Sequence, residues 1–253
     1  MTAKVIAITN QKGGVGKTTT GINLAYNLAK RGKNVLLVDF DPQGNATSGL
    51  GFNKQSLAHT IGDVVTGKIQ ARQAILTTDY EHLALLPATP HLANTEVEMT
   101  SQENRFTRLR QALESLEYDL VLIDCPPALS LLTVNALVAA RYLILPVQAE
   151  FYALEGLSQL LETVQLIRQG ANQNLELLGV VMTMYDSRTT LSKQVFDEVT
   201  KHFPDKVFHT VIPRNIRLAE APSHGVPVAV YDKWSKGARA YKQLAKEVAE
   251  RVG

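Results

Sequence analysis

A glycine-rich segment near the start of the chain carries the residues best suited to chemistry. Residues 11–18 read QKGGVGKT, directly after an apolar run and before a segment with helical periodicity. Glycines let successive backbone N–H groups point inward, and the following helix adds the positive end of its dipole. Lys17 can then reach the β- and γ-phosphates of a nucleotide, and the Thr18 hydroxyl can bind Mg²⁺. The sequence therefore predicts a triphosphate site made of Lys12, Gly13, Gly14, Val15, Gly16, Lys17, Thr18 and Thr19.

This loop departs from the usual pattern G-x-x-x-x-G-K-[ST] at its first position, where Gln11 replaces glycine, and it adds a second lysine, Lys12. The alternative is the dinucleotide fingerprint G-x-G-x-x-G, for which Asp39 could serve as the ribose-binding acid. However, Thr19 stands where the third glycine of that fingerprint belongs. The consecutive lysine and threonine favour the triphosphate site, because a phosphate–Mg²⁺ site needs that pair and a dinucleotide site does not.

Three aspartates follow predicted strands, at the edge where open α/β sheets place their ligands. Asp124 ends the run LVLID, and we expect it to hold the water shell of the metal. Asp39 and Asp41 lie two positions apart at a strand end, so that both carboxylates point the same way, one toward the metal and one toward the γ-phosphate. Alternatively, Asp41 caps the short helix that follows it. The residues thus predict a metal site of Thr18, Asp39 and Asp124.

These residues need a scaffold in which strands and helices alternate along the chain. Several short runs are apolar at successive positions, as in strands buried on both faces. The predicted strands are Val5–Thr9, Asn34–Asp39, Leu83–Pro87, Leu120–Asp124, Leu143–Val147, Leu178–Met184 and Val207–Ile212. The predicted helices are Lys17–Arg31, Asn104–Leu116, Leu131–Ala139, Leu154–Gln169 and Ser192–His202, and short helices are expected in a peripheral excursion over Gly51–Thr78. We therefore expect one α/β domain over residues 1–253, a doubly wound, mostly parallel sheet with helices on both faces, as in P-loop NTPases.

The last segment, 238–252, predicts a helix with one apolar stripe, formed by Tyr241, Leu244, Ala245, Val248 and Val252. We expect this stripe to dock on the sheet. The alternative is a helix that lies on a membrane surface, but such a helix would carry bulky Phe, Trp or Leu opposite a basic face. Here Glu247 and Glu250 dilute the polar face, so docking is favoured.

Composition and charge exclude several classes of protein. The chain has 253 residues, with 26 basic and 24 acidic side chains and one cysteine. The lone Cys125 excludes an internally disulfide-bonded scaffold and is typical of a reducing compartment. No run reaches the ~18 apolar residues of a membrane span, and the first residues do not have the layout of a signal peptide. The charge is uneven, because residues 1–185 carry a net −2 and residues 186–253 a net +4, which indicates an anionic partner for the C-terminal part.

Four motifs together resemble the ParA/Soj family of chromosome- and plasmid-partitioning ATPases. This family belongs to the deviant Walker A group that also contains MinD and the nitrogenase iron protein. The motifs are KGGVGKT, VDFDPQGN, LIDCPP and IPRNIRLAEAPSHGVPV. The first three mark the wider group and the fourth marks the Soj-like branch. The resemblance covers almost the whole chain, from Lys4 to the C-terminal helix.

The resemblance implies ATP and Mg²⁺ as ligands and gives roles to individual residues. Lys12 matches the signature lysine, which in a nucleotide-sandwich dimer reaches across the interface to contact the phosphates bound by the partner subunit. Considered alone, Lys12 could simply add positive charge near its own phosphate loop. Asp41 matches the hydrolytic aspartate that orients the attacking water, so the expected catalytic residues are Asp41, Lys12 and Lys17. Asp124 matches the second acid of the Mg²⁺ site. The adenine contacts would be Pro213, Arg214 and Asn215.

The resemblance also implies partners. ATP would drive homodimerisation, the dimer would bind double-stranded DNA without regard to sequence, and a centromere-bound ParB/Spo0J-type protein would stimulate slow hydrolysis and release the DNA. Arg188 and Arg217 match arginines that Soj-like proteins use for DNA. Further candidates, by charge alone, are Lys193, Lys233, Lys236 and Arg239, each of which also fits an ordinary solvated surface. We expect Trp234 to pack against the sheet, because readout of a duplex backbone needs no stacking.

Such a protein would be cytoplasmic and nucleoid-associated, without stable membrane binding. The main alternative is a MinD-like ATPase that cycles on a membrane to position the division site, which would need an amphipathic C-terminal anchor. An iron–sulfur relative would need two cluster-ligating cysteines in each subunit, and this chain has one. A small-molecule ligase would need a second set of reactive groups beside the phosphate site, and the sequence offers no recognisable one.

Overall fold

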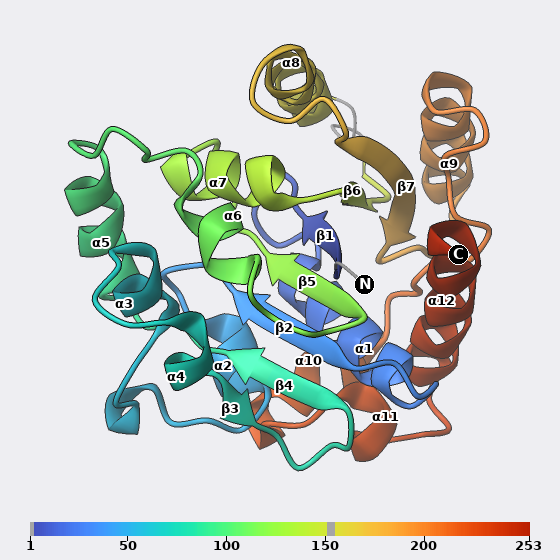
Figure 1. Ribbon diagram of the computed structural model, residues 1–253. Coiled ribbons are helices and arrows are strands. Elements are labelled where there is room, and N and C mark those ends of the chain that lie inside the picture. Colours follow the sequence, from blue (N-terminus) through green and yellow to red (C-terminus); the bar gives the residue numbers. More distant parts are fainter. Residues whose placement is uncertain (1–2, 151–154) are drawn as a thin grey trace.

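Seven strands form a single sheet at the centre of the molecule (Figure 1). The computed structural model describes residues 3–150 and 155–253. The strands follow the order β3-β4-β2-β5-β1-β6-β7, and all neighbours are parallel except β3, which runs antiparallel to β4. Their bounds are β1 Lys4–Ile8, β2 Val35–Asp39, β3 Leu76–Thr77, β4 Leu83–Leu86, β5 Leu120–Asp124, β6 Tyr142–Gln148 and β7 Glu176–Thr183.

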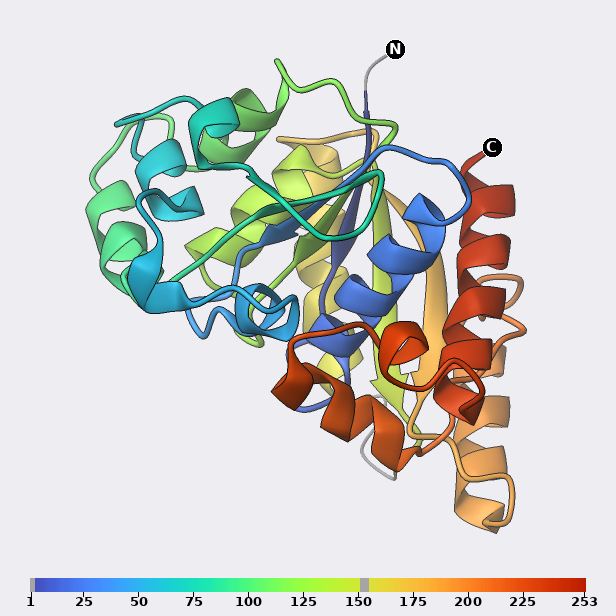
Figure 2. The same cartoon turned by 90° about the horizontal axis from the view of Figure 1, so that it is seen from below.

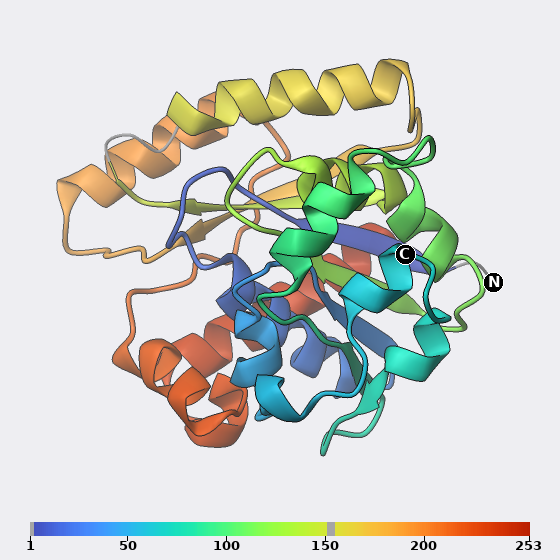
Figure 3. The same cartoon turned by 90° about the vertical axis from the view of Figure 1, so that its left-hand side faces the viewer.

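Helices cover both faces of this sheet, which Figure 3 shows edge-on between α8 on one side and the C-terminal helices on the other. The helices before β5 are α1 Lys17–Ala29, α2 Asn45–Gly49, η1 Lys54–Ser56, α3 Ile61–Val65, α4 Ala71–Ala74, α5 Leu92–Met99 and α6 Arg108–Leu113. The later ones are α7 Leu131–Ala139, α8 Glu155–Gln169, α9 Thr190–His202, α10 Ile216–Glu220, η2 Ala221–His224, α11 Val228–Tyr231 and α12 Lys236–Val252. The predicted doubly wound α/β fold is confirmed.

Two apolar cores flank the sheet because successive side chains of a strand point to opposite faces. In β1, Ile6 and Ile8 join the core formed with α1, α2, α11 and α12, whereas Ala7 joins the core formed with α3 to α9. Figure 2 shows α1 and α12 side by side on the first of these faces. The apolar runs in the sequence are thus strands buried on both sides, as predicted.

One predicted strand, Val207–Ile212, is wrong as a continuous element. The segment lies beside β7 but makes only isolated bridges, from Val207 to Val180 and from Pro213 to Tyr185. Between these bridges, the carboxylate of Glu247 on α12 accepts the backbone N–H groups of His209 and Thr210, at 2.9 and 3.0 Å. These donors are therefore used by a side chain instead of a sheet ladder.

The excursion over residues 51–78 contains η1, α3, α4 and the two-residue strand β3, so the prediction of short helices is confirmed and β3 is an addition. The predicted helix Asn104–Leu116 is shorter in the structure, where α6 spans Arg108–Leu113. Because β1, β2, β5, β6 and β7 are parallel, their carboxyl ends lie at one edge of the sheet, and the segment α10–α11 lies at the same edge (Figure 2). Open α/β sheets bind their ligands at this edge.

Candidate functional site

The glycine-rich loop leaves β1 at Ile8 and enters α1 at Lys17. Gly14 and Gly16 adopt left-handed φ angles of 75° and 88°, which residues with a side chain rarely adopt. A Cβ added at Gly13 or Gly14 would meet no atom within 4 Å, so the loop surface is open there. No side chain among the described residues caps α1, and its first N–H groups are therefore available to an anion.

The two lysines of the loop are held in different ways. Lys17 is buried, and its ammonium group donates to the backbone carbonyl of Lys12 at 3.1 Å. Burial lowers the pKa of Lys17, and the nearby charges of Asp124 and Asp41 act in the opposite direction. Lys12 instead reaches the end of β6, where its Nζ lies 2.9 Å from Oε2 of Glu150. Lys17 thus belongs to the inside of the loop and Lys12 to its outer side.

Asp124 is fully buried at the end of β5, in register with Ile8 of β1 and Asp39 of β2. Neither of its carboxylate oxygens has a hydrogen-bond partner among the described residues. Burial and the charge of Asp39 hold the pKa of Asp124 well above its usual range, and the side chains of Thr18 and Lys17 act against this. A buried carboxylate without partners is costly unless a cation or its bound water satisfies it. The residues present therefore fit a Mg²⁺ site formed with Thr18.

Asp39 is also fully buried, but its oxygens have protein partners. Its Oδ2 accepts hydrogen bonds from the backbone N–H and the hydroxyl of Thr47, both at 2.7 Å, and its Oδ1 accepts the N–H of Asp41 at 3.3 Å. Burial raises its pKa to about 6. These contacts indicate that Asp39 positions α2 and the Asp41 loop, while direct binding of the metal by Asp39 stays a prediction.

Asp41 lies just beyond β2 and is buried. Its Oδ1 accepts the backbone N–H of Gln43 at 2.9 Å, which forms a tight turn before α2. The alternative reading of Asp41 as a helix cap is wrong, because α2 begins at Asn45 with Gly44 as its N-cap and without a side-chain cap. The charge of Asp41 acts on the pKa of both Lys17 and Asp124, so the three groups share one neighbourhood. Its catalytic role stays a prediction.

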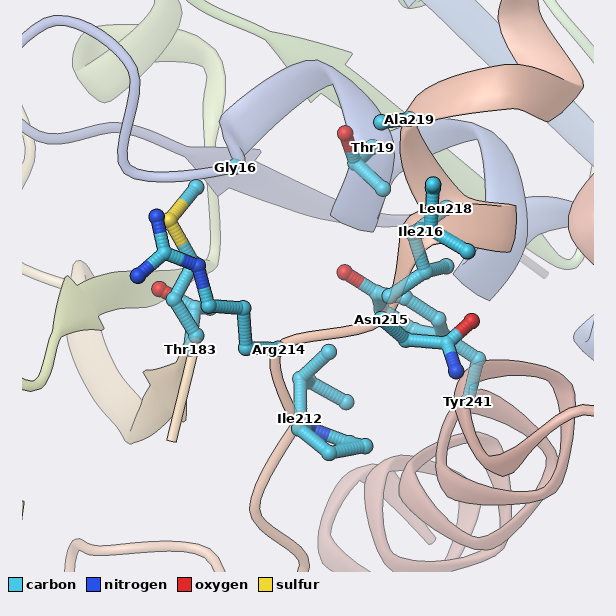
Figure 4. Close-up of a pocket in the computed structure, with 12 residues that line it drawn as sticks. Gly16, Thr19, Thr183, Ile212, Arg214, Asn215, Ile216, Leu218, Ala219 and Tyr241 are labelled. Atoms are coloured by element: carbon cyan, nitrogen blue, oxygen red, sulfur yellow. The ribbon is translucent and has the colours of Figure 1, made fainter. Parts of the chain in front are cut away.

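A cavity of about 480 Å³ opens beside the loop, between α1 and the C-terminal segment (Figure 4). All three residues predicted to contact adenine line it, together with Gly16 and Thr19 of the loop. The predicted residues are Pro213, Arg214 and Asn215. The cavity joins a phosphate-binding loop to a mostly apolar chamber, the form expected of a site for a nucleotide with its base.

Sequence reasoning missed several walls of this cavity, namely Thr183, Met184, Ile212, Ile216, Leu218, Ala219 and Tyr241. One of them, Met184, has a left-handed φ of 50°, which is unusual for a residue with a long side chain. The N–H of Tyr185 donates to Ile212 and the N–H of Arg214 donates to Tyr185, which holds the chain in this conformation. Ile212, Ile216, Leu218 and Ala219 lie within the motif IPRNIRLAEAPSHGVPV, which therefore could have found them. No local signal marks Thr183, Met184 or Tyr241, which come from β7, the residue after it and α12.

The two arginines predicted to bind DNA are exposed and paired within the chain. Arg188 meets the Asp186 carboxylate through two contacts, Nε to Oδ1 at 2.9 Å and Nη2 to Oδ2 at 2.7 Å. Arg217 lies 2.8 Å from Glu220 and 3.4 Å from Asp232. Arg188 follows β7, and Arg217 lies within α10. The lysine candidates are exposed as well: Lys193, Lys233 and Lys236.

The prediction that Trp234 packs against the sheet is wrong, because the residue is 75% exposed. The carboxylate of Asp232 accepts the N–H of Trp234 at 3.1 Å, and Ser235 is the N-cap of α12. Trp234 therefore precedes the helix, and the buried stripe of α12 begins after it.

The C-terminal stripe is docked, as predicted. Its five members, Tyr241, Leu244, Ala245, Val248 and Val252, are all buried in the core shared with α1. The Tyr241 hydroxyl lies 3.0 Å from that of Thr20, one helical turn into α1, which ties α12 to the phosphate-binding helix. Among the described residues, no helix combines the length and apolar character needed to cross a bilayer.

Known proteins match this chain along most of its length. A family model described as an AAA domain matches residues 3–177. The sporulation initiation inhibitor protein Soj of Bacillus subtilis is 54% identical, over 97% of this chain and 98% of that protein. The chromosome-partitioning ATPase Soj of Thermus thermophilus is 53% identical, over 98% of this chain and 96% of that protein.

A solved structure is also similar over nearly the whole fold. It is titled cobyrinic acid a,c-diamide synthase from Mycobacterium smegmatis with bound ATP analogue and magnesium. It superposes with a TM-score of 0.85 at 39% identity and covers 96% of this chain and 93% of that chain.

Proposed function

The chain belongs to the ParA/Soj family of chromosome-partitioning ATPases, and we propose that it is a switch in which ATP drives dimerisation and DNA binding, and hydrolysis releases the DNA. It is an ATPase whose ligands are ATP and Mg²⁺. The family role is chromosome partitioning. The proposal adds dimerisation, DNA binding and stimulation by a partner to this role.

In the proposed reaction, the glycine-rich loop binds the phosphates, and residues at the strand ends bind the metal and orient the attacking water. Backbone N–H groups at the start of α1 and the ammonium group of Lys17 bind the phosphates, while Pro213, Arg214 and Asn215 contact the base. Thr18 and Asp124 hold Mg²⁺ and its waters, and the metal, when bound, neutralises charge on the β- and γ-phosphates. Asp41 orients the water that attacks the γ-phosphate.

One observation carries the proposal of a dimer: Lys12 extends away from its own phosphate loop to Glu150, whereas Lys17 stays within the loop. A lysine that only strengthened the local field would gain most by staying near the phosphates. The outward position of Lys12 instead supports a role across an interface, where it would reach the phosphates of the second subunit.

Charge supports the proposal of DNA as the partner of the dimer. The C-terminal part from residue 186 carries a net +4, and two copies would double it. Nonspecific binding of duplex DNA is chiefly phosphate neutralisation with counterion release. Arg188, Arg217 and the exposed lysines at positions 193, 233 and 236 are the proposed contacts. We place this activity in the cytoplasm, on the nucleoid, with a ParB/Spo0J-type protein as the stimulating partner.

A MinD-like membrane cycle is the competing proposal. It would need a free amphipathic C-terminal helix, but the apolar stripe of α12 is buried in the core and tied to α1 through Tyr241. The partitioning proposal therefore has the better support.

The test is binding of labelled random-sequence duplex DNA without nucleotide, with ADP, with ATP and with a slowly hydrolysed ATP analogue. We expect dimers and DNA binding only with ATP and the analogue. The Lys12→Ala variant should bind ATP but form neither dimer nor DNA complex, and the exposed control Lys68→Ala should behave as the parent chain. Equal DNA binding in all nucleotide states would refute the switch, and ATP-dependent sedimentation with anionic vesicles in place of DNA binding would favour the membrane cycle.

A further inference from the structure

The exposed indole of Trp234 has no explanation in the fold. It is the only tryptophan of the chain, and it is more exposed than any other large apolar side chain in the described residues. Lone exposed apolar residues are common, but a tryptophan loses the most by facing water. This cost indicates a side chain that is covered when a partner binds.

The backbone holds the indole in a defined place. Asp232 accepts the N–H of Trp234 at 3.1 Å and, through its carbonyl, the hydroxyl of Ser235 at 2.9 Å. The same Ser235 hydroxyl oxygen accepts the N–H of Ala238 at 3.1 Å and caps α12. The platform beneath the ring is thus fixed before binding, which lowers the entropy cost of a contact made by the ring.

One cation lies over this ring, and two others lie on the adjoining segments. The Lys233 Nζ lies 5.2 Å from the ring centroid, and Lys236 is exposed at the first position of α12. Arg217 reaches the same turn through Asp232, at 3.4 Å. Arg217 contacts both carboxylates of this region, Asp232 and Glu220. Together with Lys233 and Lys236, these five groups carry a net charge of +1. An apolar ring in a region of net positive charge is complementary to a polyanion that also offers apolar surface.

We infer that Trp234 is a direct DNA contact, which packs against the sugars and base edges of the minor groove while Lys233, Lys236 and Arg217 neutralise the flanking phosphates. The inference rests on the proposed function. Architectural proteins place apolar side chains in the minor groove in this way, and such contacts are tolerant of sequence. A membrane is the less suitable partner, because interfacial helices need a continuous apolar face and the apolar face of α12 is buried.

The single tryptophan makes the test direct, because tryptophan fluorescence of the unmodified chain reports only on Trp234. Acrylamide quenching is measured with no ligand, with the slowly hydrolysed ATP analogue, with the analogue plus duplex DNA, and with the analogue plus anionic vesicles. DNA binding is followed in parallel by anisotropy of the labelled duplex. We expect the analogue alone to leave quenching unchanged and the analogue with DNA to reduce it strongly.

Variants separate the ring from the charges. Trp234→Ala should weaken DNA binding about five- to tenfold, a loss of the size known for aromatic contacts with nucleic acid. It should leave the salt dependence unchanged, because the indole carries no charge. Lys233→Ala should reduce the slope of log binding constant against log salt concentration by the equivalent of about one phosphate contact per subunit. Trp234→Phe should keep most of the affinity. Leu166→Ala, an exposed apolar control on α8 at the opposite face, should change nothing.

The outcomes distinguish this inference from the proposed function. If the duplex binds and Trp234 stays as quenchable as before, the inference is wrong and the proposed function stands. Protection by the analogue alone would place the indole at the subunit interface, and protection by vesicles alone would place it on a membrane. Each of these two results overturns the DNA contact. If no DNA binds in any nucleotide state, both the proposed function and this inference fail.

Discussion

The ammonium group of Lys12 lies 2.9 Å from the carboxylate of Glu150, at the end of β6 and outside the phosphate loop. The Gln148 side chain also donates to this carboxylate, so Glu150 is held in place beside the lysine. The pair keeps Lys12 on its own subunit, where it competes with any use of the lysine by a second copy.

We predict that Glu150→Gln tightens ATP-dependent dimerisation by up to about fivefold, the range expected for release of a partly exposed ion pair. Lys12→Ala should abolish the dimer without loss of ATP binding. Light scattering against protein concentration, with the slowly hydrolysed analogue, measures both effects. Weaker dimerisation of Glu150→Gln would show that the glutamate helps the interface instead of competing with it.

A second prediction concerns Asp124, whose buried oxygens have no partner in the described part of the chain. Asp124→Asn keeps the shape and removes the charge. Without nucleotide, this variant should therefore be more stable than the parent by about 1–2 kcal/mol at neutral pH, since a carboxyl group whose charged form is disfavoured by burial is replaced by a neutral amide. With ATP, Mg²⁺ should no longer stabilise this variant against unfolding, and its ATP turnover should fall about 10- to 100-fold. Thermal unfolding with and without Mg²⁺–ATP measures both changes, and a less stable nucleotide-free variant would contradict this account of the site.

The phosphate loop and the aspartates of this site could be predicted from sequence, because each is marked by residues that lie close together along the chain. The glycines lie next to the Lys17–Thr18 pair, Asp39 and Asp124 each end an apolar run, and Asp41 follows two residues after Asp39. The parallel sheet follows from the alternation of those runs with helical segments. The predicted strand over 207–212 fails for a reason that lies far away in sequence, since Glu247 takes its backbone donors.

The third prediction concerns the two arginines at the carboxyl edge of the sheet. The double variant Arg188→Ala/Arg217→Ala should lose DNA binding at moderate salt. The slope of log binding constant against log salt concentration should fall by the equivalent of about two phosphate contacts per subunit. Both arginines are exposed and form surface ion pairs, Arg188 with Asp186 and Arg217 with Glu220 and Asp232, so their removal should leave the unfolding temperature nearly unchanged. Lys68→Ala is the matched control for an exposed cation elsewhere. Normal DNA binding by the double variant would place the DNA surface on another face.

Pro213, Arg214 and Asn215 at the base end of the cavity are predicted through the family resemblance, but the Tyr241 wall and the position of Trp234 are not, because both depend on how α12 is placed. Tyr241 reaches the cavity only through its contact with Thr20 on α1. Tryptophan is a residue type that is usually largely buried, so its sequence position predicts packing against the sheet. However, the turn at Asp232 and the N-cap at Ser235 place Trp234 before the helix and outside the core. Local periodicity contains neither piece of information.

The fourth prediction concerns Asp41, whose proposed role is to orient the attacking water. Asp41→Ala should keep ATP affinity, dimerisation and DNA binding, because phosphate binding depends on the loop and on Lys17. Turnover should fall at least about 100-fold, as expected when a group positioned for the transition state is removed. Loss of nucleotide binding would instead assign Asp41 to the structure of the loop.

The central claim is that hydrolysis times the release of DNA, and the dissociation rate of preformed complexes tests it most directly. Parent chain and Asp41→Ala are loaded on labelled duplex with ATP, and unlabelled DNA is then added in excess. We expect the parent chain to leave the labelled duplex at the rate of its ATP turnover, whereas Asp41→Ala should stay bound for many times longer. Equal dissociation rates for the two proteins would contradict it.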